Sequence, residues 1–179
     1  MPEPASLPTV VLIGMMGSGK TLVGRALATR TGWRYVDNDE LVRTVTGREP
    51  EEIDATDGDD ALHLAEAEAL RHALMAPPPL IVGAAAWVVT DPASVALLRA
   101  RPVVVYLRAR PDTLRARIGT GVGRRDDATD PAWLRARSAE RDRMYRDLAT
   151  LTIDTDTLEV EGIAERILAA LKAWPWFPG

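Results

Sequence analysis

One short stretch near the N-terminus constrains this chain more than any other. Residues 14–21 read Gly-Met-Met-Gly-Ser-Gly-Lys-Thr, which fills every fixed position of the phosphate-binding pattern G-x-x-x-x-G-K-[ST]. The apolar residues 10–13 precede it, and a helical pattern over residues 22–28 follows. Strand, glycine loop and helix are the context that this motif needs. The alternative is a chance glycine-rich turn with an exposed lysine, and the agreement of motif and context argues against it.

The residue types of this loop explain how it would hold a chain of phosphates. Glycines lack the Cβ atom that disfavours positive φ, so the backbone can curl until successive N–H groups point inward. The helix that follows adds the positive end of its dipole. Lys20 can reach the β- and γ-phosphates of a nucleotide, and the Thr21 hydroxyl can bind Mg²⁺. The nucleotide-binding residues that we expect here are Gly14, Met15, Met16, Gly17, Ser18, Gly19, Lys20 and Thr21.

Composition narrows the class of protein. The length suits one domain with a sizeable core, which we expect to cover residues 1–179. A net charge of −4 argues against a non-specific nucleic-acid binder, and the lack of cysteine excludes disulfides and thiol nucleophiles. No apolar run approaches the ~20 residues of a membrane span, and residues 1–8 lack the pattern of a signal peptide. We therefore expect a cytoplasmic protein that binds neither membranes nor nucleic acid.

Apolar runs alternate with helical patterns along the chain. The expected strands cover residues 9–13, 33–36, 80–82, 103–107 and 152–154. The expected helices cover residues 20–31, 39–47, 51–57, 59–75, 92–100, 111–118, 131–148 and 160–173. This alternation predicts an α/β fold with a parallel sheet between two layers of helices, and ligands at the carboxyl ends of the strands. Residues 119–130, rich in Gly, Thr, Arg and Asp, predict a lid loop. Residues 174–179 form an aromatic tail that packs on the domain or contacts another chain.

Two carboxylates follow the second expected strand, in Asp37-Asn38-Asp39. If the backbone is extended there, both side chains leave the same face. One could then support the water shell of a metal while the other accepts a proton from a substrate hydroxyl. The alternative is that Asp39 is only the N-cap of the next helix. The position at a strand end favours a functional role.

Arginines gather after the fourth expected strand. Arg117 flanks the lid loop, and Arg124 and Arg125 lie within it. An arginine that closes over the γ-phosphate would neutralise charge in the transition state. The alternative is a solvated basic loop, and we favour function because a lid must also exclude water. Arg141 is one of several arginines on a polar helix, so its spacing alone gives it no role.

An ordered set of short motifs makes the interpretation more specific. In chain order these are residues 14–21, Val36-Asp37-Asn38-Asp39, Ala55-Thr56-Asp57-Gly58, Gly83, Val104-Val105-Tyr106-Leu107, residues 140–146 and Ile153-Asp154-Thr155. Together they resemble the shikimate kinase family over residues 9–171. The resemblance implies a three-layer αβα P-loop kinase fold, with five parallel strands in the order 2-3-1-4-5. It also implies transfer of the γ-phosphate of ATP, with Mg²⁺, to a hydroxyl of a small polyol acid such as shikimate.

The resemblance assigns roles on the nucleotide side of the site. It implies that Lys20 and Thr21 bind the phosphates and Mg²⁺, and that Asp37 supports the metal. It also implies that Arg124 contacts the phosphates from the lid and that Arg117 lies near the adenine. Lys20 and Arg124 would then stabilise charge on the transferred phosphoryl group.

On the substrate side, the resemblance implies that Asp39 binds and activates the acceptor hydroxyl and that Arg141 holds the substrate carboxylate. A second arginine of the family is replaced here by His63. Histidine is mostly neutral at pH 7 and cannot form a bidentate fork. A charged hydrogen bond contributes about 1.5–3 kcal/mol, so the loss is on the order of tenfold to a hundredfold in affinity.

Two further departures concern backbone space and the lid. The family carries three glycines where this chain has Gly83-Ala84-Ala85, which we still expect to contact the substrate. If either alanine position needs positive φ, the cost is about 1–2 kcal/mol. In any case two methyl groups occupy space near the substrate. The lid reads Arg124-Arg125-Asp126-Asp127 where the family has Arg-Pro and apolar residues.

These departures leave three hypotheses open. The chain is a shikimate kinase with reduced activity, a kinase re-targeted to another small polyol or cyclitol, or a non-catalytic nucleotide-binding module. Intact Thr21, Asp37 and Asp39 count against the module. Because His63 halves the cationic clamp, we expect shikimate to bind weakly. We also expect a monomer.

Overall fold

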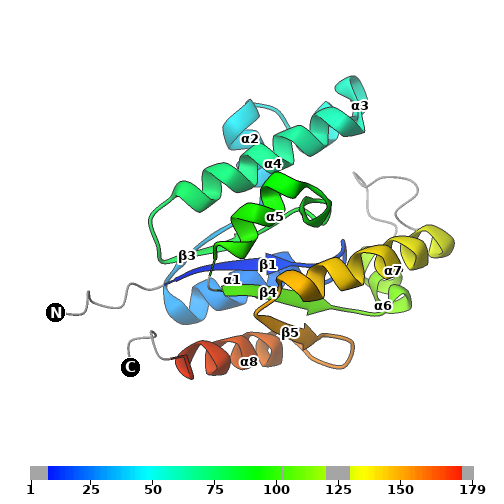
Figure 1. Cartoon of the computed structure of the whole chain (residues 1–179). Coiled ribbons are helices and arrows are strands. Elements are labelled where there is room, and N and C mark those ends of the chain that lie inside the picture. The colour runs from blue at the N-terminus through cyan, green and yellow to red at the C-terminus, as the bar shows by residue number, and fades with distance from the viewer. Residues whose placement is uncertain (1–7, 102, 120–129, 175–179) are drawn as a thin grey trace.

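The computed structural model describes residues 8–101, 103–119 and 130–174. Its centre is a sheet of five strands in the order β2-β3-β1-β4-β5 (Figure 1). The strands are β1 (Thr9–Ile13), β2 (Arg34–Val36), β3 (Leu80–Gly83), β4 (Val103–Arg108) and β5 (Leu151–Asp154). Every neighbouring pair is parallel, as expected when a helix separates consecutive strands. The predicted α/β fold and its strand order are confirmed.

Two layers of helices cover the sheet. The helices are α1 (Lys20–Thr31), α2 (Asn38–Thr46), α3 (Pro50–Asp57), α4 (Asp59–Met75), α5 (Pro92–Arg99), α6 (Pro111–Ile118), α7 (Pro131–Leu148) and α8 (Val160–Lys172). In Figure 1, α1 and α8 lie against one face, and α4, α5 and α7 lie over the other. A short 3₁₀ helix, η1 (Val88–Thr90), follows β3 and is not predicted by the sequence pattern.

The strand side chains alternate between two hydrophobic clusters. In β1, Val10 and Leu12 pack into the cluster beneath α1 and α8, whereas Val11 and Ile13 pack into the cluster beneath α4, α5 and α7. All four side chains are fully buried. Because both faces of the strand are covered, residues 10–13 of β1 form an unbroken apolar run. The sheet is thus a rigid base for the loops at its carboxyl edge.

The observed element boundaries agree with the predicted ones to within one residue. Trp174, at the start of the predicted tail, packs against the cluster beneath α1 and α8. Residues 175–179, and residues 120–129 of the predicted lid, lie outside the described residues. Over the ranges described, no helix is both long and apolar enough to cross a membrane.

Candidate active site

The loop between β1 and α1 adopts a tight curl. Gly14 has a φ of 147° and Gly19 a φ of 98°, a region that strains L residues. Space also demands glycine at position 14, because a Cβ atom there would lie 2.6 Å from the Leu107 carbonyl oxygen. The Lys20 ammonium donates to the carbonyl oxygens of Gly14 (2.8 Å) and Met15 (3.0 Å). The lysine therefore helps to hold the phosphate loop in its curled form.

A cleft of about 1490 Å³ extends from this loop to α4. The predicted site residues that line it are Met16, Gly17, Ser18, Gly19, Lys20, Thr21, Asp37, Asp39, His63, Ala84, Ala85, Arg117 and Arg141. The fold thus brings residues from the whole length of the chain to one cleft. Arg124 and Arg125 lie outside the described residues, so the contact of the lid with phosphate stays a prediction.

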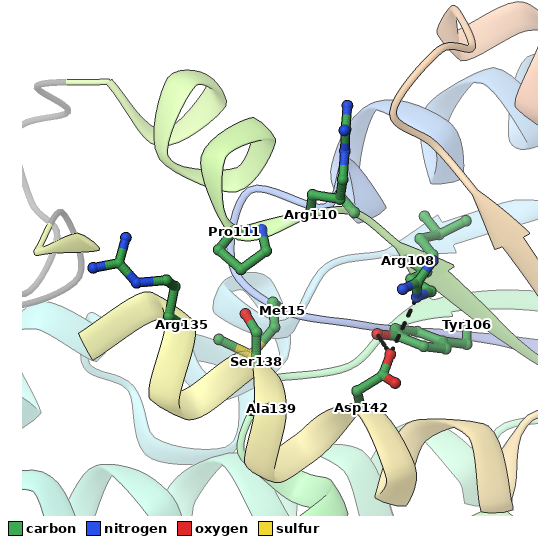
Figure 2. Close-up of a pocket in the computed structure, with 11 residues that line it drawn as sticks. Met15, Tyr106, Arg108, Arg110, Pro111, Arg135, Ser138, Ala139 and Asp142 are labelled. Carbon is green, nitrogen blue, oxygen red and sulfur yellow. Dashed lines mark hydrogen bonds and ion pairs between the residues drawn. The ribbon is translucent and has the colours of Figure 1, made fainter. Parts of the chain in front are cut away.

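Three other predicted residues do not line this cleft: Gly14, Met15 and Gly83. The buried Met15 side chain lines a second cavity of about 250 Å³, between β4, α6 and α7, together with Tyr106 (Figure 2). At Gly83, a Cβ atom would lie 2.6 Å from the Tyr35 hydroxyl oxygen. Gly83 therefore makes room for a neighbouring side chain.

A carboxylate and a hydroxyl meet beside the phosphate loop. The Thr21 hydroxyl donates to Asp37 Oδ2 at 2.7 Å, and the Tyr35 hydroxyl donates to the same oxygen at 2.7 Å. Burial and the Asp37 carboxylate raise the pKa of the Tyr35 phenol, which keeps its proton. Oxygen donors are the ligands that Mg²⁺ prefers, so Thr21 and Asp37 fit a cation carried by a nucleotide. Tyr35 is a residue of this site that the sequence pattern does not predict, since its only signal is its place two residues before Asp37.

Asp39 lies in the first turn of α2, which begins at Asn38. The backbone is therefore not extended from Asp37 to Asp39, so the condition for both side chains to leave the same face is not met. The alternative that Asp39 caps the helix is wrong, because Asp37 occupies the N-cap position. Both carboxylates nevertheless line the cleft, since the chain turns from strand to helix between them. The Asn38 amide lies between Asp39 Oδ1 and Glu66 Oε1, at 3.3 Å from each.

The wall opposite the phosphate loop is formed by α4 and the connection after β3. The His63 imidazole stacks on Trp87, with ring centroids 4.2 Å apart and planes inclined by 6°. Its Nε2 atom lies 3.6 Å from Asp59 Oδ1, one turn earlier on α4. The imidazole is therefore packed on one face against an indole, and one edge lies near a carboxylate. Trp87 was not predicted as a site residue, because the stack joins two segments far apart in the sequence.

Glu66 lies one turn after His63, and the pKa of its carboxyl group is raised. Burial raises the pKa of Glu66 to about 7, and the carboxylates of Asp39 and Asp59 add to this shift. The hydrogen bond from Asn38 and the charge of Arg141 oppose it. Glu66 therefore changes charge near neutral pH, in the part of the cleft formed by α4.

The alanines after β3 are not strained. Among the described residues, every positive φ belongs to a glycine, so Ala84 and Ala85 have ordinary backbone conformations. The Ala84 N–H donates to the Leu12 carbonyl at 3.0 Å, which holds this segment against β1. The conditional cost of an alanine at positive φ is therefore not incurred. Both residues line the cleft, so the expected loss of space remains.

Two arginines complete the cleft at opposite ends. Arg117 Nη1 donates to Thr155 Oγ1 at 2.9 Å and Nη2 donates to the Thr155 carbonyl at 2.6 Å, which ties α6 to the segment after β5. Residues 156–160 of that segment also line the cleft. Arg141, on α7, lies in the half that faces Glu66, and its Nε is buried without a hydrogen-bond partner among the described residues. A buried guanidinium donor of this kind suits an anionic ligand.

The fold and the cleft define the class of protein. A phosphate loop after β1, carboxylates after β2 and a facing wall with an arginine, on a sheet of order β2-β3-β1-β4-β5, are the features of a P-loop kinase for small molecules. The chain belongs to the shikimate kinase family, because the family model described as "SKI: Shikimate kinase" matches residues 16–172. The resemblance noted in the sequence is therefore confirmed.

Individual relatives agree with this assignment. The shikimate kinase of Moorella thermoacetica is 37% identical over 170 residues, which cover 92% of this chain and 95% of that protein. The shikimate kinase of Thermobifida fusca is 34% identical, with 94% of this chain and 98% of that protein covered. The structure of the shikimate kinase from Acinetobacter baumannii in complex with shikimate is 26% identical, with a TM-score of 0.86, and covers 94% of this chain and 95% of that chain. A gluconokinase from Sinorhizobium meliloti, 20% identical with a TM-score of 0.65 and 93% of each chain covered, shares the fold.

Proposed function

We propose that this protein is a shikimate kinase that transfers the γ-phosphate of ATP to a hydroxyl of shikimate. The observation that carries the proposal is one cleft that joins a phosphate loop to a wall that includes the Arg141 side chain. A guanidinium at that place fits the carboxylate of a hydroxy acid. The relatives from Moorella thermoacetica, Thermobifida fusca and Acinetobacter baumannii support the same substrate, since they are named shikimate kinases and the structure of the third contains shikimate.

In this mechanism the phosphate loop neutralises the transferred group. The Lys20 ammonium exchanges the carbonyl oxygens of Gly14 and Met15 for β- and γ-phosphate oxygens. Thr21 and Asp37 would hold Mg²⁺, which when bound neutralises phosphate charge. Our candidate for the contact from the lid is Arg124, which lies outside the described residues.

At the other side of the γ-phosphate, the acceptor must lose a proton. Asp39 is our candidate for the group that orients the acceptor hydroxyl and accepts this proton, since it lines the cleft between the phosphate loop and α4. The Asn38 amide lies 3.3 Å from Asp39 Oδ1 and would restrict its rotation. We also propose that the active unit is a monomer.

The wall formed by α4 and the connection after β3 favours a second class of acceptor, a polyol without a carboxylate. The stack of His63 on Trp87 puts aromatic surface at a place where the family resemblance implies an arginine, and the methyl groups of Ala84 and Ala85 narrow the same end. Such a wall suits a polyol or cyclitol without a carboxylate. We therefore propose weak use of shikimate, with another small polyol as the alternative acceptor.

The test is ATP consumption with shikimate and with a panel of neutral polyols and cyclitols, with Asp39→Asn as the inactive control. We expect turnover with shikimate at a Michaelis constant well above the micromolar range, and loss of turnover in Asp39→Asn with nucleotide binding retained. Turnover with a neutral polyol alone would replace shikimate by that acceptor. Nucleotide binding without turnover on any acceptor would refute the kinase assignment.

A further inference from the structure

Tyr35 has no role in the mechanism above, yet its hydroxyl donates to Asp37, one of the two residues that would hold the metal. We propose that Tyr35 is a positioning residue, which fixes the Asp37 carboxylate and, through it, the Thr21 hydroxyl for the cation that accompanies the nucleotide. This inference rests on the proposed function, because it concerns the metal that ATP brings to the cleft.

The hydrogen bonds leave one orientation for both groups. Asp37 Oδ2 accepts from Thr21 Oγ1 and from the Tyr35 hydroxyl, each at 2.7 Å. A hydroxyl has one hydrogen and two lone pairs, so a Thr21 hydrogen directed at Asp37 leaves its lone pairs for a cation. The second bond, from Tyr35, prevents the carboxylate from turning away from Thr21. Tyr35 therefore acts on the metal ligand through Asp37, without touching the metal itself.

Two glycines leave space for the Tyr35 side chain. Gly24 lies inside α1, and a Cβ atom there would lie 2.2 Å from Cε2 of the Tyr35 ring. Gly83, at the end of β3, would place a Cβ atom 2.6 Å from the Tyr35 hydroxyl oxygen. Glycine inside a helix is unfavourable relative to alanine, so its presence in α1 has a packing reason. One glycine admits the ring and the other admits the hydroxyl.

The Tyr35 hydroxyl, beside Gly83, distinguishes a positioning role for this residue from a role in which its ring only fills space. A phenylalanine would fill the ring site equally well and would need no room for an oxygen beside Gly83. Groups that orient a metal ligand typically change metal affinity by about tenfold to a hundredfold when removed. Since Thr21 is one of several groups that would hold the cation together with the phosphates, we expect the lower end of this range.

The experiment measures ADP binding by calorimetry, with Mg²⁺ and with EDTA, for the full chain and for Tyr35→Phe. We expect Tyr35→Phe to bind ADP normally in EDTA, but to need about tenfold more Mg²⁺ to reach the affinity of the wild-type chain. The matched control is Tyr106→Phe, which removes a phenol that donates to Asp142 Oδ1 at 3.0 Å in the second cavity (Figure 2). It should leave the Mg²⁺ requirement unchanged. Gly83→Ala, which displaces the Tyr35 hydroxyl, should shift the requirement in the same direction as Tyr35→Phe.

Two results would overturn the inference. One is a Mg²⁺ requirement in Tyr35→Phe within twofold of the wild-type and Tyr106→Phe values. The other is an equal loss of ADP affinity with Mg²⁺ and with EDTA, which would place the effect on the nucleotide pocket instead of the metal. Because ADP binding needs no acceptor, the result stands even if shikimate proves not to be the substrate. The inference and the proposed function can therefore fail separately.

Discussion

Replacing His63 by arginine tests the acceptor wall most directly. The imidazole is now held between Trp87 and Asp59, and a guanidinium on the same turn of α4 could still stack on the indole while reaching further into the cleft. A charged hydrogen bond to the shikimate carboxylate contributes about 1.5–3 kcal/mol, and each 1.4 kcal/mol is about tenfold in affinity. We therefore expect a lower Michaelis constant for shikimate.

The neighbouring carboxylates set the size of this effect. Asp59 Oδ1 lies 3.6 Å from His63 Nε2, and Glu66, with a pKa of about 7, is mostly ionised at pH 8. Both would compete with the substrate for the new guanidinium. We therefore expect the lower end of the range, a decrease of about tenfold in the Michaelis constant for shikimate. The turnover number and the Michaelis constant for ATP should change little, since the phosphate loop is untouched.

The assay is steady-state ADP release at pH 8 with saturating ATP and varied shikimate. The matched control is His72→Arg, which makes the same chemical change in the last turn of the same helix, at an exposed residue that does not line the cleft. If His63→Arg and His72→Arg give the same Michaelis constant within twofold, then position 63 does not face the substrate. The halved clamp would then be the wrong explanation for weak binding.

Two further predictions concern stability. Burial raises the pKa of Glu66 in the folded state to about 7, above the ordinary value of 4.5, so the folded state binds more protons than the unfolded state between these pH values. The free energy of unfolding therefore falls as pH rises through this window, by roughly 3 kcal/mol. Glu66→Gln should remove this part of the slope in urea unfolding between pH 4.5 and pH 8, and an unchanged slope would contradict the shift. Gly24→Ala should lower the melting temperature, because its Cβ would lie 2.2 Å from the Tyr35 ring and overpacking costs about 1–3 kcal/mol. Gly162→Ala, in open space on α8, should raise it slightly, and equal shifts in the two variants would disprove the packing argument.

Local pattern was sufficient for most of the fold. The phosphate loop fixes a strand before it and a helix after it, and the unbroken apolar run of β1 follows from burial on both faces. The strand order came from the family resemblance, since alternation of strands and helices gives a parallel sheet without stating which strands are neighbours. The short helix η1 has no pattern of its own because three residues are too few to show a period.

The site was less predictable where it depends on contacts between distant segments. The stack of His63 on Trp87 joins α4 to the connection after β3, and the sequence of neither segment alone predicts this contact. Gly83 was expected at the substrate, but the sequence cannot show which neighbour a missing Cβ makes room for. Asp39 was considered as the N-cap of its helix, whereas α2 begins at Asn38 and Asp37 is the N-cap. These differences arise from tertiary packing, which residue spacing does not encode.

The residues of α4 that line the cleft lie on one side of the helix, at Asp59, Leu62, His63 and Glu66. The groups that hold phosphate lie on another part of the chain, between β1 and α1. In the function proposed above, substitutions at Asp59, Leu62 and His63 would therefore alter which alcohol binds while the phosphate loop stays unchanged. Glu66 is best left out of such a library, because it shares the Asn38 amide with Asp39, our candidate base.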